Sequence, residues 1–297
     1  MLRSALAVCL ILAGCSPSEQ AVEEEVSQEG TDTGVAAAVP ANVPAPDGVT
    51  IHYEDQGKGE VALVFVHGWS CDRSYWNAQR DHFAANYLVV TVDLAGHGES
   101  GDNRDQFTMH AFGADVAAVI TALDLSNVVL VGHSMGGPVV LAAGNRLKGR
   151  VAAVVGVDTL RDISQRRTPA EIDERVARLD ADFVGDTRRV VSDMFVAQSD
   201  PTLKDWVVDD MASAPPRVAK SAMRGMSAYD ARAGIAGLGV PLALINSDYR
   251  PNNPAPVAAA AQSFTYIEMS DVGHFVMMED PETFNRHLEE IIESLAL

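Results

Sequence analysis

The stretch 127-NVVLVGHSMGGPVVLAAG-144 places a polar segment inside an otherwise apolar run. Residues 127–131 are β-branched and almost uninterrupted, which predicts a short buried strand. From Pro138 to Leu147, a proline in the first turn is followed by Ala and Leu, which predicts a helix. Residues 132–137 therefore form the turn between a strand and a helix. Glycines on both sides of Ser134 indicate a turn too tight for side chains at its flanks.

The rest of the chain alternates in the same way. Phe107 to Leu123 has helical spacing of apolar residues, and a helical tail is predicted from about Pro281 to Leu295. Short apolar runs predict strands at Val49–Glu54, Val61–Val66, Tyr87–Val92, Asn127–Val131, Val151–Val157, Val240–Ile245 and Phe264–Glu268. Strands that alternate with helices predict an α/β fold, in which a mostly parallel twisted sheet has helices on both faces.

One long segment, from Leu160 to Leu238, interrupts this alternation. It is rich in Met and Ala, contains no clear strand and has the pattern of several short helices. We expect a helical cap at about 160–238, laid over the carboxyl ends of the strands, where ligands bind in such sheets. Its methionines are expected in the core, with some of them lining a deformable apolar pocket.

The first residues have the pattern of an export signal. One basic residue precedes a short apolar run that is too brief to span a bilayer, which is typical of a secretory signal peptide. The residues LAGC at 12–15 resemble the bacterial lipobox, in which the cysteine becomes lipidated. We therefore expect a signal peptide over 1–14, lipidation of Cys15 and a folded domain over 47–297.

The intervening segment, 15–46, is acidic and rich in proline. It has no Lys, Arg, aromatic, Ile or Leu residue, which predicts a flexible tether. A lipid anchor on such a tether predicts an envelope lipoprotein, attached to the outer membrane because Ser16 follows the cysteine. The alternative is a soluble secreted or periplasmic protein whose Cys15 is incidental.

The bulk composition narrows the possible partners. The 297 residues carry a net charge of −19, which argues against nucleic acid, because phosphate binding needs a basic face. Apolar residues make up 47% of the chain, enough to bury a full core.

Of the three cysteines only Cys71 lies in the expected folded domain, so no disulfide can form within it. We interpret Cys71 as a small buried side chain.

Four motifs in order resemble those of the α/β-hydrolase family. GHSMG at 132–136 fits the G-x-S-x-G nucleophile elbow, with a strand before it and a helix after it. HGW at 67–69 resembles the family's HG loop, DLAGHGES at 93–100 its D-x-x-G-x-G-x-S loop, and DVGHF at 271–275 its late G-H motif. The resemblance covers about residues 49–297 and implies a serine esterase or lactonase with a cap.

The resemblance implies a serine nucleophile and a histidine base. Ser134 lies on the elbow at a helix N-terminus, whose free N–H groups favour developing negative charge. A serine hydroxyl needs a base to remove its proton. Of the eight histidines, His274 follows the last strand and a glycine, so it is expected on a loop over the same sheet edge.

Two aspartates compete to orient this histidine. Asp248 follows the strand that ends at Ile245, which matches the family's usual position, although Asn246 stands where glycine is frequent. Asp158 ends the preceding strand, and some family members take their acid from that position. The order Ser, Asp, His holds for both. We favour Asp248, with Asp158 as the alternative.

An oxyanion hole needs two N–H donors aimed at the developing alkoxide. The family pattern assigns them to the backbone of Met135, directly after the nucleophile, and of Trp69, after His67-Gly68. No phosphate-binding loop and no histidine or cysteine cluster with metal-ligand spacing is present in the sequence, so neither a cofactor nor a metal is expected.

These residues predict a hydrolase that cleaves carboxylic esters of small molecules through an acyl-enzyme. A lactonase and a C–C bond hydrolase of the same fold use the same residues and are the alternatives. From a different class, the domain could be a catalytically silent binding module. The sequence ranks no particular substrate and says nothing of the oligomeric state.

Overall fold

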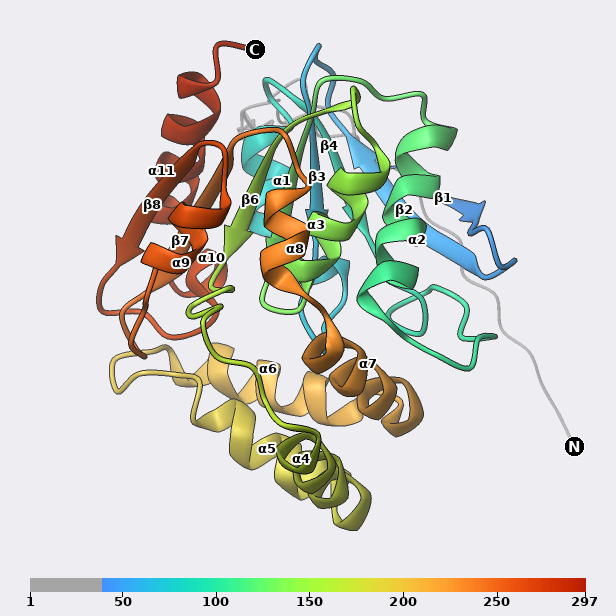
Figure 1. Cartoon of the computed structure of the whole chain (residues 1–297), viewed down its shortest axis with the longest axis vertical. Coiled ribbons are helices and arrows are strands. Elements are labelled where there is room, and N and C mark those ends of the chain that lie inside the picture. Colours follow the sequence, from blue (N-terminus) through green and yellow to red (C-terminus); the bar gives the residue numbers. More distant parts are fainter. Residues whose placement is uncertain (1–38) are drawn as a thin grey trace, which may run out of the picture. The chain divides into compact units, whose positions relative to one another are not determined.

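The computed structural model describes residues 39–297 of the chain. Eight strands form one sheet in the order β1-β2-β4-β3-β5-β6-β7-β8 (Figure 1). The strands β3 to β8 run parallel, and β1 and β2 are antiparallel to their neighbours. Their bounds are β1 Val39–Pro44, β2 Thr50–Gln56, β3 Ala62–Val66, β4 Leu88–Val92, β5 Val128–His133, β6 Val151–Val157, β7 Leu242–Ser247 and β8 Phe264–Met269.

The predicted α/β class is confirmed, and each strand predicted from an apolar run is present with its ends within two residues. The central strands β3 and β5 are buried along their whole length. Continuous apolar runs are what a strand covered on both faces requires.

The strand β1 corrects one boundary. Its residues belong to the segment expected as a flexible tether, but Val39–Pro44 pairs antiparallel with β2. The turn between the two strands closes through Gly48, whose φ of +85° suits glycine. Proline is tolerated in this strand because β1 lies at the sheet edge. The remainder of the expected tether, the signal peptide and Cys15 lie outside the described residues.

Helices cover both faces of the sheet. On one face lie α2 (Met109–Ala122), α3 (Gly136–Arg146) and α8 (Ala231–Ala236), which pack side by side (Figure 1). The other face carries α1 (Asn77–Phe83), preceded by the short 3-10 helix η1 (Arg73–Trp76), together with α11 (Pro281–Ser294). Two further short helices are α9 (Ala255–Ala260) and α10 (Val276–Glu279).

The sequence predicted a helical cap at about 160–238, but α8 falls within that span and packs against α3 on the sheet, so the cap is shorter than expected. The cap consists of short helices between β6 and β7. They are α4 (Pro169–Ala181), α5 (Phe183–Ser192), α6 (Pro201–Ser213) and α7 (Pro216–Ala228), and they form a separate layer at one end of the sheet (Figure 1). The sequence sets their starts. Thr168 forms a capping box with Glu171, and the side chains of Asp182 and Asp200 accept backbone N–H groups at the next two starts.

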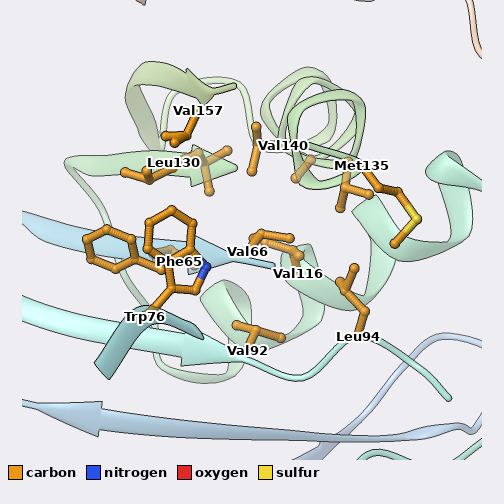
Figure 2. Packing of buried hydrophobic residues seen from close by; sticks show 14 of the residues in the cluster. Phe65, Val66, Trp76, Val92, Leu94, Val116, Leu130, Met135, Val140 and Val157 are labelled. Carbon is orange, nitrogen blue, oxygen red and sulfur yellow. The ribbon is translucent and has the colours of Figure 1, made fainter. Parts of the chain in front are cut away.

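The core lies directly beneath the residues of the elbow. Figure 2 shows Phe65 and Val66 of β3 packed against side chains from the neighbouring strands and from α3. Trp76 packs against Phe65 with the two rings tilted and their centroids 5.0 Å apart, and it is fully buried. This packing holds the carboxyl ends of β3, β5 and β6 in a fixed position. Within residues 39–297, no helix combines the length and the apolar character that crossing a membrane requires.

Candidate active site

Ser134 lies on a strained turn between β5 and α3. Its φ is +52°, in the left-handed region that non-glycine residues rarely adopt. The flanking glycines are required by contact: a Cβ on Gly132 would lie 2.3 Å from the carbonyl oxygen of Gly136. A Cβ on Gly137 would lie 2.5 Å from the side chain of Thr159. The close packing that the glycine pattern predicted is therefore present.

The neighbouring strand β6 braces this turn. The amide of Ser134 donates to the carbonyl of Val157 at 2.9 Å, and the hydroxyl of Thr159 donates to the carbonyl of Ser134 at 2.7 Å. These bonds compensate part of the backbone strain and hold Ser134 Oγ in one place.

The loop after β8 brings His274 to this serine. Nε2 of His274 lies 2.9 Å from Oγ of Ser134. The backbone amide of His274 donates to the carbonyl of Met194 at 2.8 Å, which ties the loop to the cap segment. His274 is buried, with 8% of its surface exposed. The structure thus brings together two residues that are 140 positions apart in the sequence.

The aspartate that faces His274 is Asp158, and the expectation of Asp248 is wrong. Nδ1 of His274 hydrogen-bonds Oδ2 of Asp158, which is buried. Asp248 is exposed, and its backbone amide pairs with Met269 on β8. The physical reason is strand order. Asp158 follows β6, the direct neighbour of the strand that carries Ser134, whereas Asp248 follows β7, one strand further away.

Asp158 receives hydrogen bonds on both carboxylate oxygens. The amide and the hydroxyl of Ser247 donate to Oδ1 at 2.8 and 2.9 Å, and the guanidinium of Arg161 contacts the same oxygen. Burial raises the pKa of Asp158, but the charges and hydrogen bonds of His274 and Arg161 outweigh it and lower this pKa to about 2. The carboxylate therefore stays ionised at neutral pH.

Arg161 is a site residue that the sequence analysis did not identify. Its Nη1 donates to the carbonyls of Ser247 and Arg250 and to Oδ1 of Asn252, at 3.0, 2.8 and 3.1 Å. The guanidinium also lies 4.6 Å from the ring centroid of Tyr249. Arg161 thereby ties the loop after β6 to the loop after β7. The only sequence signal is its position three residues after Asp158.

This geometry selects one tautomer of a neutral His274. With Asp158 ionised, a neutral imidazole carries its proton on Nδ1 and donates it to the carboxylate. Nε2 is then a free acceptor, facing the hydroxyl of Ser134. A base that faces a hydroxyl and is held by a third, anionic group is the arrangement that activates a serine.

The backbone donors predicted for an oxyanion lie next to the serine. A Cβ on Gly68 would lie 3.2 Å from Cβ of Ser134, so the loop of residues 67–69 passes directly beside it. Within the described chain, the amides of Trp69 and Met135 donate to no protein acceptor. The indole of Trp69 donates to the carbonyl of Ala219 at 2.7 Å, which links this loop to α7.

His67 stabilises the same loop as a neutral side chain. Its Nε2 accepts from the amide of Leu94 at 3.0 Å, so its proton must be on Nδ1, which donates to the carbonyl of Gly68 at 2.8 Å. Burial lowers its pKa to about 4. Asp93, the first residue of the 93–100 loop, has a structural role: it accepts from the amides of Arg73 and Glu99 at 2.8 and 2.9 Å.

Two more side chains near the serine have structural contacts. His133 packs against His274 and its Nε2 lies 3.0 Å from the carbonyl of His274. Burial lowers the pKa of His133 to about 3, so it stays neutral. Cys71 is buried, and burial raises the pKa of its thiol. These contacts agree with the interpretation of Cys71 as a small buried side chain.

Two spaces are lined by Ser134 and His274. A cleft of about 780 Å³ is lined by the loop after β6, by residues 226–232 and by Tyr249 and Arg250. A smaller pocket of about 50 Å³ lies under the cap and has mostly apolar walls, four of them methionines: Met194, Met211, Met223 and Met226. Within residues 39–297, no group of three His, Cys, Asp or Glu side chains is placed to hold a metal ion.

The sequence pattern of the alpha/beta hydrolase family matches residues 63–287. Since this match spans most of the chain, the protein belongs to that family. The membership agrees with the four motifs and with the observed sheet.

Individual relatives carry several activities. The chain is 40% identical to a non-heme chloroperoxidase of Burkholderia pyrrocinia over 123 residues, which are 40% of this chain and 44% of that enzyme. That match therefore spans less than half of the relative. A 3-oxoadipate enol-lactonase of Acinetobacter baylyi is 26% identical over 239 residues, 79% of this chain and 89% of that one.

An esterase from Exiguobacterium antarcticum has a similar solved structure, with a TM-score of 0.78 at 20% identity. The superposition covers 86% of this chain and 100% of the esterase. At that identity the likeness shows a shared fold.

Proposed function

We propose that the protein is a serine hydrolase that cleaves carboxylic esters through an acyl-enzyme. The contact of 2.9 Å between Ser134 Oγ and His274 Nε2, with Asp158 on the opposite ring nitrogen, carries the proposal. Ser134 attacks the ester carbonyl while His274 takes its proton, and Asp158 stabilises the resulting imidazolium.

The following steps use the same groups. The amides of Trp69 and Met135 hold the negative oxygen of the tetrahedral intermediate. His274 then returns its proton to the leaving alcohol, and the acyl group remains on Ser134. A water molecule deprotonated by His274 attacks the acyl-enzyme, and the carboxylic acid leaves with Ser134 restored.

Lactones are the second substrate class that we propose. A lactone is a cyclic ester, so the same steps open it, with the alcohol remaining attached to the acid. The enol-lactonase relative, which is similar over 79% of this chain, supports this class. Both classes are small carbonyl compounds that the cleft of about 780 Å³ can hold.

The first test is Ser134→Ala, measured with a fluorophosphonate probe and with short neutral esters. We expect the probe to label Ser134 in the unchanged protein, and turnover to fall by about 10⁶-fold in the variant. Mass spectrometry of the labelled peptide locates the adduct, and circular dichroism checks that the variant stays folded.

A matched control is Ser164→Ala, which removes an exposed serine of the cleft rim. It should keep both labelling and turnover. Unchanged turnover in Ser134→Ala would reject the proposed nucleophile. A folded protein with neither labelling nor turnover would favour the non-catalytic binding module.

A further inference from the structure

The charges around the site differ from those of the whole chain. The chain has 22 Lys and Arg residues against 41 Asp and Glu residues. Five arginines nevertheless line the cleft that contains Ser134 and His274, and no lysine does: Arg161, Arg166, Arg167, Arg232 and Arg250. Because the protein as a whole is acidic, we expect these five guanidinium groups to have a role at this cleft.

The acidic side chains of the same cleft already have partners within the protein. Asp158 is held by His274 and Arg161, as described above. The remaining three cap turns or helices: Asp162 accepts from the amide and hydroxyl of Ser164, Glu171 from the amide of Thr168, and Asp230 from the amide of Ala233 and from Arg166.

Three of the five arginines form no ion pair with a carboxylate. Among residues 39–297, no carboxylate forms an ion pair with Arg167, Arg232 or Arg250. All three are exposed at the cleft. With five arginines and four carboxylates in its lining, the cleft has a net formal charge of +1, which attracts anions to it.

A fourth unpaired arginine lies deeper. Arg175 of α4 lines the small pocket together with Ser134 and His274. It is only partly exposed, and no carboxylate of the described chain pairs with it. Burial, with added repulsion from Arg167 and Arg178, lowers the pKa of Arg175 to about 10. The guanidinium stays charged at neutral pH, but its charge is poorly compensated.

The helix that carries Arg175 also has acidic residues, but none of them pairs with Arg175. The four acids of α4 all contact other groups: Glu171 caps the helix, Asp173 pairs with Arg224, Glu174 with Arg178 and Asp180 with Lys220. A partly buried guanidinium that no carboxylate contacts is costly, because the charge of Asp186, which pairs with Arg189, offsets its desolvation only in part. A carboxylate of a bound ligand would offset the desolvation cost of the Arg175 guanidinium.

We propose that the site accepts esters or lactones that carry a carboxylate on a short acyl chain, and that Arg175 binds this carboxylate in the small pocket. The inference rests on the proposed hydrolase function and specifies its substrate class. A guanidinium binds a carboxylate through two parallel hydrogen bonds, which are stronger where apolar side chains exclude water. The methionines, Trp69 and Phe275 supply such walls.

The size of the small pocket sets the length of the acyl chain. A volume of about 50 Å³ holds about four groups of the size of a water molecule. That is enough for a carboxylate and one or two methylene groups. Monoesters of dicarboxylic acids with four carbons therefore fit, whereas long fatty acyl chains do not.

The test compares two methyl esters of the same shape by titrating the acid released. Methyl hydrogen succinate carries the carboxylate, and methyl 4-methylpentanoate has an isopropyl group in its place. We expect kcat/KM to favour the charged ester by at least about 10-fold. Arg175→Met should reduce this preference by about 10- to 100-fold, the value of a charge-assisted hydrogen-bonded pair.

Two control variants separate charge at this position from general effects. Arg178→Met removes a guanidinium from the same helix that pairs with Glu174 and is about half exposed, and it should leave the ratio of the two kcat/KM values unchanged. Arg175→Lys keeps the charge and should restore part of the preference. An equal or opposite preference in the unchanged protein, or a ratio that Arg175→Met does not alter, would overturn this inference.

The same assays separate the two proposals. If neither ester is cleaved and the fluorophosphonate does not label Ser134, the hydrolase proposal fails. In that case succinate binding to the unchanged protein and to Arg175→Met, measured by calorimetry, still tests the anion pocket. Neutral ester turnover without a charge preference would retain the hydrolase and reject the role of Arg175.

Discussion

The sequence offers two aspartates that could orient the ring of His274. The order of the strands in the sheet places only one of them beside it. Asp158 and Asp248 both follow a strand and both lie between Ser134 and His274 in the chain. Only Asp158 follows the strand adjacent to β5, and there it accepts from Ser247 and contacts Arg161. The aspartate that orients His274 is therefore set by its neighbours in space.

The matched pair Asp158→Asn and Asp248→Asn tests this choice. Asp158→Asn leaves the imidazole in the wrong tautomer, so we expect kcat on a neutral ester to fall by about 10⁴-fold. Asp248→Asn, at an exposed position, should retain nearly full activity. A large loss in Asp248→Asn and a small one in Asp158→Asn would reverse the assignment.

Arg161 explains how the acid is held after its strand has ended. Asp158 has a φ of +44°, so the backbone turns sharply there, and the side chain needs external support. Arg161 provides it by bonding to the carboxylate and to the loop after β7. It is a positioning residue, since it acts on His274 only through Asp158.

At the scale of elements, β1 is the least expected part of the fold. Its sequence, VPANVP, contains two prolines and no run of apolar residues. It forms a strand because β2 offers an unpaired edge and because Val43 reaches the core, where it is 7% exposed. Pairing with a preformed edge here outweighs a poor local preference for strand.

Substituting Val43 tests whether this strand contributes to stability. Val43→Ala removes two buried methyl groups and should lower the free energy of unfolding by about 1–2 kcal/mol, measured by urea denaturation. Thr50→Ala, at an exposed position of β2, should change it by less than about 0.5 kcal/mol. If the Val43→Ala protein were as stable as the unchanged one, residues 39–46 would belong to the flexible tether, as the sequence had predicted.

The cap helices differ from β1, because local sequence signals are enough to predict where they start. Each helix start has an N-cap side chain or a proline, and these are visible in the sequence at Thr168, Asp182 and Asp200. What they do not indicate is which face of α4 meets the pocket. That depends on how α4 packs against α5 and α7.

For the molecule as a whole, the buried histidines predict sensitivity to acid. Burial lowers the pKa of His67 to about 4, and those of His97 and His133 to about 3, from an unfolded value of 6.5. Below pH 6.5 the unfolded chain binds protons that the folded protein does not, so stability is lost as the pH falls toward 4. Asp115, whose pKa burial raises to about 6, opposes this trend, as do Asp55, Asp93 and Asp210, whose pKa values burial also raises.

Urea denaturation at pH 7 and at pH 5 measures this loss. Each shifted histidine contributes up to about 1.4 kcal/mol per pH unit within this window. His97→Asn should make the dependence on pH shallower, whereas substitution of the exposed His110 by Gln should leave it as it is. A stability that is flat or rises between pH 7 and pH 5 would contradict the neutral, buried state of these histidines.

Local sequence patterns were enough for the features that depend on neighbouring residues. Apolar runs and glycine turns are local, so the strands, the elbow at Ser134 and the loop histidine His274 could be predicted from them. The proposal that Cys15 carries a lipid anchor likewise rests on sequence alone. Four features became clear only from the folded chain: the pairing of β1, the choice of Asp158, the link through Arg161 and the position of Arg175 in the small pocket. These are contacts between residues far apart in the chain, and they follow from strand order and helix packing, which no local pattern encodes.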